Sequence, residues 1–218
     1  MLVLSKSDVP FPSPGSTGQF GSAHTVTITS GGTLRVGANW VLGTGLQHTI
    51  KVNGGTLEFS GSDNYQGKIE LTGGRITTSG GSRPWRTGYW GDGLITVKAS
   101  ASSSTIEGRL SFVKTASATK TTFDVEDGPA AQDLIVSAQI VDHGGGYEGM
   151  ELVKTGAGTM VLSGANTYIG PTTILAGKLL LMGTHTPATT PGLYTVGVGA
   201  LLGGTGTTKA PGWLPAYA

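Results

Sequence analysis

The sequence predicts an all-β chain that winds into a solenoid, and three observations carry this prediction. Short alternations of apolar and polar residues, typical of half-buried strands, recur along the chain. They repeat after about 20 residues, close to one coil of a three-sided β-helix. Paired glycines begin at Gly31, Gly54 and Gly73, spaced by 23 and 19 residues. Glycine suits a tight corner because it adopts positive φ at little cost.

Composition narrows the range of functions. The chain has 218 residues, 38 of them glycine, and only 12% of its residues are charged. The net charge of +1 offers no electrostatic footprint for a nucleic acid, so no such partner is expected. No apolar run approaches the length of a membrane span, and residues 1–20 do not read as a signal peptide. The absence of cysteine excludes disulfides, zinc–thiolate sites and thiol catalysis.

The first elements follow from this pattern in order. Residues 1–24 contain Pro10, Pro12 and Pro14, which cannot donate ladder hydrogen bonds, and we expect an N-terminal arm that caps the first coil. Alternation begins after His24 and predicts strand pairs over 26–36, 50–60 and 69–79, each pair bent at its glycines. The N-terminal arm is expected to act as a cap because the first coil of a solenoid would otherwise leave an apolar face exposed.

The second half continues the stack with larger interruptions. The alternation breaks over 80–93, returns over 94–97 and 105–125, and resumes at 134–141. Residues 126–133 and 143–149 have the composition of loops. The strongest strand pattern spans 151–182, a looser coil covers 194–202, and residues 203–218 form a C-terminal tail. No linker divides the chain, so we expect one domain over 1–218.

Residues 151–182 resemble the passenger-associated transport repeat, also called the autotransporter-associated β-strand repeat. The matching residues are Leu152, Lys154, Thr155, Gly156, Gly158, Thr159, Leu162, Ser163, Gly164, Asn166, Thr167, Tyr168, Gly170, Thr172, Thr173, Ala176, Gly177 and Leu179. The resemblance implies a right-handed, single-stranded parallel β-helix at the surface of a bacterium or outside it. It also implies that the repeat is structural and that the chain is part of a larger secreted protein.

The interruption at 83–92 is the candidate binding site. It concentrates tryptophan, tyrosine and arginine, and aromatic faces can stack on sugar rings while arginine and aspartate bond hydroxyls. An equal alternative is a lid in which the indoles fold back over a strand face. Two aromatic residues one and two coils earlier could extend the platform. The candidate ligand-binding residues are Trp85, Tyr89, Trp90, Arg83, Arg86, Asp92, Trp40 and Tyr65.

Acidic residues offer a second chemistry. Asp124 and Glu126 share one face of an expected strand, as hydrolytic carboxylates or calcium ligands would. A solvated strand end with a turn-forming aspartate is the simpler interpretation of these residues. Asp142, His143 and Glu148 flank a glycine-rich loop, where a hydrogen-bonded loop is the simpler interpretation. No catalytic residue and no cofactor are expected, calcium being the one ion that the acidic pair could hold.

These observations favour a non-catalytic carbohydrate-binding module that binds an extended polysaccharide, such as the plant cell-wall polymer xylan, by aromatic stacking. The structural alternative is a passenger stalk or adhesin segment. The enzymatic alternative is a polysaccharide lyase or hydrolase. The first requires exposed indoles at 83–92, the second buried ones, and the third a groove lined by several carboxylates.

Overall fold

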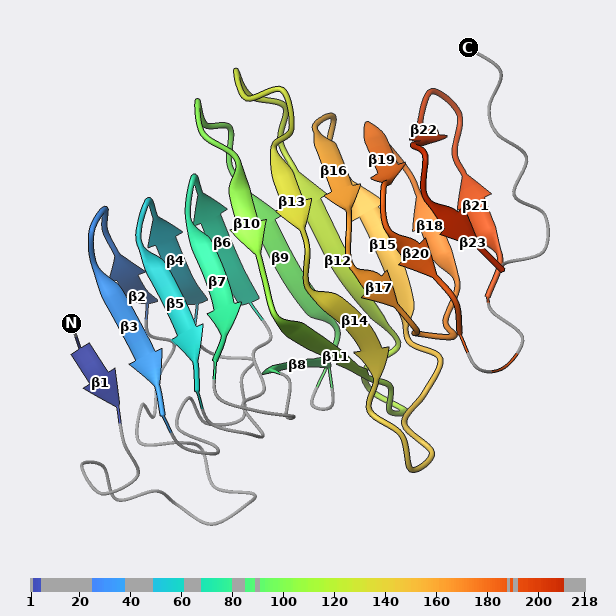
Figure 1. The fold of residues 1–218 in the computed structure, drawn as a ribbon, viewed down its shortest axis with the longest axis horizontal. Helices are drawn as coiled ribbons and strands as arrows, with labels where there is room; N and C mark the ends of the chain where they lie inside the picture. Colours follow the sequence, from blue (N-terminus) through green and yellow to red (C-terminus); the bar gives the residue numbers. More distant parts are fainter. Residues whose placement is uncertain are drawn as a thin grey trace.

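The computed structural model describes residues 2–4, 25–37, 49–60, 68–79, 85–88, 91–187, 189 and 192–209; of 2–4 only the backbone is described. Within these residues every regular element is a β-strand, and no helix is long and apolar enough to cross a membrane. The strands pair in parallel and stack along one axis, with the N-terminal and C-terminal coils at opposite ends (Figure 1). The prediction of an all-β parallel solenoid is confirmed.

Two long sheets run the length of the stack. One sheet contains nine described strands: β1 (Leu2–Leu4), β3 (Thr33–Val36), β5 (Thr56–Phe59), β7 (Arg75–Thr78), β10 (Ser104–Ile106), β13 (Leu134–Val136), β16 (Thr159–Leu162), β19 (Lys178–Leu181) and β22 (Leu201–Gly203). The other contains eight: β2 (Thr25–Ile28), β4 (Thr49–Asn53), β6 (Lys68–Thr72), β9 (Gly93–Val97), β12 (Lys120–Val125), β15 (Glu151–Thr155), β18 (Thr172–Ile174) and β21 (Tyr194–Val196).

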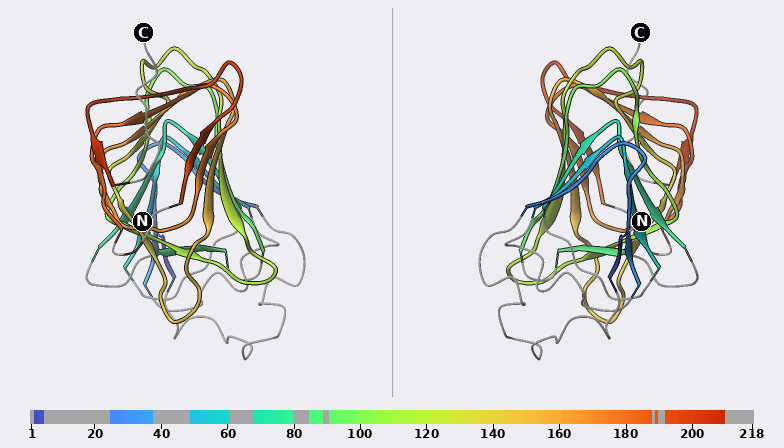
Figure 2. Two further views of the ribbon diagram at one scale, coloured as in Figure 1. Left: turned by 90° about the vertical axis from the view of Figure 1, so that its right-hand side faces the viewer. Right: turned by 90° about the vertical axis from the view of Figure 1, so that its left-hand side faces the viewer.

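A third face closes the later coils and consists of two short sheets. The first contains β8 (Trp85–Gly88), β11 (Arg109–Val113) and β14 (Gln139–Asp142). The second contains β17 (Ala165–Asn166), β20 (Thr184–His185) and β23 (Thr207–Thr208). Viewed along the stack, the three faces surround one interior (Figure 2). We call this side of the molecule the third face.

The alternation of the sequence decides which residues enter this interior. In β4, for example, Ile50 and Val52 are buried while Lys51 between them reaches the surface side. The parallel register then stacks like on like, as in the row Leu34, Leu57 and Ile76. The result is a continuous aliphatic core along the axis, which supplies the main stabilisation of such a fold.

The predicted glycine corners are confirmed. Gly31, Gly54 and Gly73 have φ angles of 74°, 69° and 57°, the left-handed region that other residues rarely adopt. Each corner joins a strand of the eight-stranded sheet to one of the nine-stranded sheet. The spacing of glycine pairs therefore marks successive coils.

The two ends differ from the expected boundaries. Leu2–Leu4 of the predicted arm form β1, which pairs with β3 at the N-terminal end of the nine-stranded sheet. Gly203 belongs to β22, and Thr207–Thr208 form β23, which pairs with Thr184–His185. The prediction of an irregular tail from 203 is therefore wrong up to Thr208, because these residues continue the ladder. The other residues expected in the arm and tail, apart from Lys209, lie outside the described part of the chain.

Candidate functional site

The aromatic segment does not present Trp85 to a ligand. Trp85 begins β8 and pairs with Leu110 of β11, a register that points its indole inward. The side chain is 0% exposed and stacks on Phe59, with ring centroids 5.4 Å apart and planes 2° apart. The prediction of an exposed stacking ring is therefore wrong for Trp85, since the interior offers its large apolar surface a dry environment.

The other residues of the proposed platform separate into two groups. Arg83, Tyr89, Trp90, Trp40 and Tyr65 lie outside the described residues. Arg86 is described, and its side chain is buried on the outer side of β8. For all six residues, a role in ligand binding stays a prediction.

Asp92 ties one coil to the next. Its Oδ1 accepts hydrogen bonds from the backbone N–H groups of Thr119, at 2.7 Å, and Lys120, at 3.1 Å. Its Oδ2 lies 4.0 Å from the Lys120 Nζ. This carboxylate therefore satisfies backbone donors at the start of β12, a structural use of the residue that the sequence placed in the binding site.

The pair Asp124 and Glu126 is also engaged by neighbours. Thr155 Oγ1 donates to Asp124 Oδ1 at 2.8 Å, and Lys98 Nζ lies 2.6 Å from Glu126 Oε1. The hydrogen bond from Lys98 holds the pKa of Glu126 below its usual value. A general acid needs the opposite shift. Among the described residues no three histidine or acidic side chains converge as metal ligands would.

Asp142 anchors the glycine-rich loop, as the simpler interpretation of 142–149 predicted. Its Oδ1 accepts from Gly149 N at 3.0 Å, and its Oδ2 accepts from Ile169 N, in the next coil, at 2.7 Å. Burial raises the pKa of this carboxyl, while the two backbone donors act against the rise. The loop is thereby fixed to the stack.

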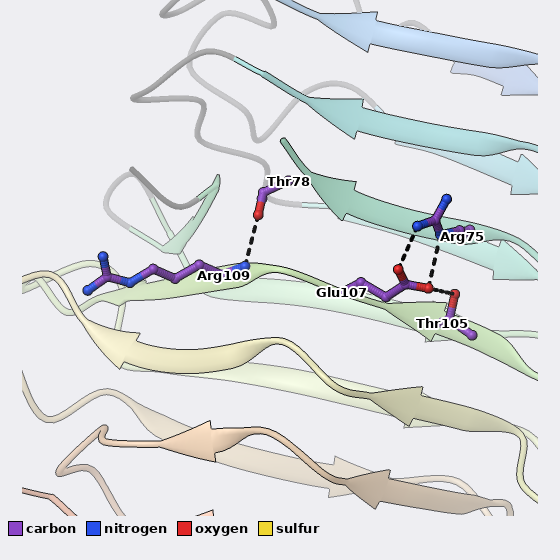
Figure 3. Close-up of polar contacts among 5 residues, drawn as sticks. All are labelled: Arg75, Thr78, Thr105, Glu107 and Arg109. Carbon is purple, nitrogen blue, oxygen red and sulfur yellow. Dashed lines mark hydrogen bonds and ion pairs between the residues drawn. The ribbon is translucent and has the colours of Figure 1, made fainter. Parts of the chain in front are cut away.

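An ion pair between coils lies on the outer side of the nine-stranded sheet. Arg75 of β7 donates from Nε to Glu107 Oε1 at 2.9 Å and from Nη2 to Oε2 at 2.6 Å (Figure 3). Thr105 Oγ1 also donates to Glu107 Oε1, at 3.4 Å. In the same view the side chain of Arg109 extends away from this pair, while its backbone N–H donates to Thr78 Oγ1 at 2.9 Å. The pair is mutually satisfied and holds no reactive group.

Two buried polar groups were not predicted as such. Lys154 of β15 is 0% exposed, and its Nζ donates to the carbonyls of Thr155, Gly156 and Ala176 at 2.7, 2.8 and 3.2 Å. Burial lowers the pKa of Lys154 to about 8, and the carboxylates of Asp124 and Asp133 oppose that shift. The parity of Leu152 and Lys154 within one strand is the signal that could have revealed an inward lysine.

The second group centres on His185 of β20. Its ring stacks on Tyr168 with centroids 4.2 Å apart. Nε2 lies 2.7 Å from the Tyr168 carbonyl and Nδ1 lies 2.8 Å from the Tyr194 hydroxyl. Because a carbonyl only accepts, Nε2 carries the proton and Nδ1 accepts from Tyr194. Burial lowers the pKa of His185 and raises that of Tyr194 to about 12, so both groups are neutral at pH 7.

Comparison with known proteins identifies the repeat. The family model described as the passenger-associated-transport-repeat matches residues 50–77 and 152–181. The second match confirms the resemblance found at 151–182, and the first adds a repeat where only the alternation had been recognised. The two matches cover equivalent elements, β4 to β7 and β15 to β19, so one repeat spans two strand–corner–strand units.

The same comparison yields a relative among bacterial surface proteins. A segment of 54 residues is 48% identical to the adhesin BmaC autotransporter of Brucella suis biovar 1 (strain 1330). The match covers 25% of this chain and 2% of the length of that adhesin. No solved structure matches the chain. The repeat and the adhesin relative mark the chain as a surface-exposed or secreted bacterial protein.

Proposed function

We propose that the chain is a non-catalytic structural segment of an autotransporter passenger, which forms part of the rod of an adhesin-like surface protein. One observation carries the proposal: the residues that define the repeat build the coil itself. Leu152 and Leu162 enter the core, Gly156 turns a corner at φ 74°, and Lys154 bonds corner carbonyls. All four residues serve the coil itself.

The remaining polar residues of the repeat support the same conclusion. Asn166 accepts from Ile140 N at 2.9 Å and donates to the Gly164 carbonyl at 3.2 Å, so its amide joins two coils. Tyr168 is buried, with its hydroxyl 2.7 Å from Thr172 Oγ1. Side chains that are fully used inside the stack are typical of a scaffold.

The carbohydrate-binding hypothesis on the aromatic segment has no support from the described residues. It required exposed rings, and Trp85 lies in the core. The hydrolase or lyase alternative required a groove lined by several carboxylates, whereas Asp124 bonds Thr155 and Glu126 bonds Lys98, and neither lines the groove of the third face. The described residues therefore favour the scaffold over both.

A deletion in register tests the scaffold role. Leu57 and Ile76 occupy equivalent positions in adjacent coils, so removing residues 57–75 places Ile76 where Leu57 was. We expect this variant to keep its β-sheet circular dichroism and a cooperative unfolding transition, because one repeated unit has been removed whole. In a surface-displayed passenger, we expect it to keep a terminal epitope accessible to antibody on intact cells.

The matched control removes residues 57–65, about half a coil, and shifts the register of everything that follows. Loss of sheet structure and of display is expected for this variant alone. If the whole-coil deletion fails as completely as the half-coil deletion, the coils are not interchangeable building units and the proposal is wrong.

A further inference from the structure

The third face carries a groove that the scaffold role leaves unused. It has a volume of about 600 Å³ and is lined by residues of four successive coils: Arg109, Gln139, Val141, Asp142, Gly144, Glu148, Thr167, Ile169, Thr186 and Thr189. The lining residues belong to β11, β14 and the segments that follow β14, β17 and β20, and the order of these strands along the stack can be followed in Figure 1. A groove that crosses strands follows the axis of the solenoid.

One wall of the groove is fixed in place by the loop 143–149. Gly144, Gly145 and Gly146 have φ angles of 83°, 70° and 93°, a path that residues with a Cβ rarely follow. Asp142 bonds the end of this loop and the backbone of Ile169 in the following coil. Glu148 Oε1 accepts from Gly146 N at 3.3 Å. The wall is therefore preorganised and needs little ordering when a ligand binds.

The lining repeats from coil to coil. Arg109 pairs with Gln139 in the ladder of β11 and β14. The Thr167 N–H bonds the Ile140 carbonyl and the Thr186 N–H bonds the Asn166 carbonyl, which continues the outer row Val141, Thr167 and Thr186. Parallel strands lie about 4.8 Å apart, and each of the four coils supplies a polar side chain, Arg109, Gln139, Thr167 and Thr186 in turn, although Gln139 lies two positions before Val141 in β14.

Its chemistry suits hydroxyl groups. Gln139 offers an amide, Thr167, Thr186 and Thr189 offer hydroxyls, and the aliphatic floor comes from Val141 and Ile169. Arg109 contributes one positive charge, and Asp142 and Glu148 contribute one negative charge each, so the lining has a formal charge of −1 and does not favour an anionic ligand. Groups that both donate and accept hydrogen bonds, above an apolar floor, match the hydroxyls and C–H faces of a sugar.

The spacing distinguishes a glycan from a peptide. An extended peptide rises by about 3.3 Å per residue and would fall out of step with the coils. β11 pairs with β8 and β14 on its two edges. On the far side of β14, the Ile140 carbonyl accepts from Thr167 N and the Ile140 N–H donates to Asn166 Oδ1, so the following coil occupies the place where a peptide strand would add. A β-1,4-linked pyranose chain, in contrast, advances by nearly one strand spacing per sugar.

We infer that this groove binds an extended, uncharged glycan parallel to the solenoid axis, with one sugar on each coil. The glycan contacts Gln139 and the row of Thr167 and Thr186. None of the described residues of the aromatic segment lines this groove. The inference does not depend on the proposed scaffold role, and the deletion of residues 57–75 leaves all the lining residues in place.

The test is isothermal titration of the folded chain with neutral β-1,4-linked hexasaccharides of xylose, glucose and N-acetylglucosamine. We expect at least one of the three to bind. The double variant Gln139→Ala with Thr167→Val is expected to weaken that binding about tenfold or more, since two neutral hydrogen bonds are lost. Thr122→Val, on the outer side of the eight-stranded sheet, is the control and should bind as the parent does.

Three results would overturn the inference, provided that circular dichroism shows the variants folded. The first is no binding of any hexasaccharide at millimolar concentration. The second is equal affinity of the parent and the double variant. The third is tighter binding of hexagalacturonate, or of a neutral extended peptide of equal length, than of every neutral hexasaccharide.

Discussion

The interior side chains of the third face differ between the middle coils, which contain β8, β11 and β14, and the C-terminal coils, which contain β17, β20 and β23. On the third face, the inward row begins with Trp85, Leu110 and Ile140, all fully buried and apolar. The same row then continues through Asn166 and His185, which are equally buried and polar. The change occurs between Ile140 and Asn166, where the asparagine accepts the Ile140 N–H at 2.9 Å.

This difference teaches where a solenoid can hold polar groups inside. A polar side chain is tolerated where the neighbouring turn supplies its partner, as Tyr168 and Tyr194 do for His185. The middle coils are stabilised by apolar area, which is not directional, whereas the C-terminal coils depend on a few hydrogen bonds. Substitutions should therefore act differently in the two regions.

The largest effect is expected in the apolar region. Trp85→Ala removes the ring that stacks on Phe59 and leaves a cavity, which should lower the free energy of unfolding by about 3–5 kcal/mol. Chemical denaturation measures this loss. Leu94→Ala, at a side chain that is 37% exposed, is the control and should cost much less. A loss below about 1 kcal/mol for Trp85→Ala would mean that the core contact is not formed.

Lys154→Met tests the polar region at the corner. It leaves the carbonyls of Thr155, Gly156 and Ala176 without their shared donor, and we expect a loss of about 2–3 kcal/mol in chemical denaturation. Lys178→Met, at an exposed position of β19, controls for the removal of charge and should have little effect. Equal stability of the two variants would show that the buried ammonium contributes nothing.

Acid should weaken the C-terminal coils in particular. Burial lowers the pKa of His185, so as pH falls through about 6.5 the unfolded chain takes up a proton before the folded chain does. Stability is then complete above that pH and falls below it, by at most about 1.4 kcal/mol per pH unit. The protection factors of the Thr184 and His185 amides, which are corrected for the pH dependence of intrinsic exchange, should fall between pH 7 and pH 5, and His185→Gln should abolish that fall.

If the protection factors of the β4 and β6 amides fall by the same factor over this pH range, the response is global and His185 is not its source. The comparison of the two regions would then have no energetic basis. His143→Gln, in the glycine-rich loop, provides the matched histidine control.

The smallest effect is expected at the surface. Arg75→Gln breaks the pair with Glu107, both of which are substantially exposed, and should cost less than about 1 kcal/mol. A double-mutant cycle with Glu107→Gln measures the coupling, which should shrink in 1 M salt. A coupling energy well above about 1 kcal/mol that does not change with salt would mean that this surface ion pair contributes substantially to the stability of the fold.

The sequence was a good guide to the fold because strand alternation and glycine corners are local signals. The inward positions of Ile50, Val52 and Leu57 follow from parity alone. The position of the aromatic segment does not follow from local pattern, because Trp85–Gly88 form only a short strand whose pairing with β11 depends on residues about 25 positions away. The sequence therefore leaves an exposed platform and a buried indole equally open, and the pairing with β11 places Trp85 in the interior.

The polar interior and the groove were beyond the reach of local pattern for a related reason. Lys154 has an inward parity, but only the carbonyl of Ala176 in the next coil explains why an ammonium can stay there. The groove joins Gln139 to Thr186, residues that come together only through the register of successive coils. Resemblance identified the repeat, while the geometry between coils had to come from coordinates.

Residues that pair between adjacent coils are close together in the sequence, and this closeness affects how the chain folds. Partners on adjacent coils, such as Arg35 with Glu58 and Arg75 with Glu107, are separated by 23 and 32 residues. Each coil can therefore pair its strands with those of the preceding coil, and its folding does not depend on contacts with residues far away in the sequence. Folding of such a chain can thus proceed coil by coil along the axis of the stack.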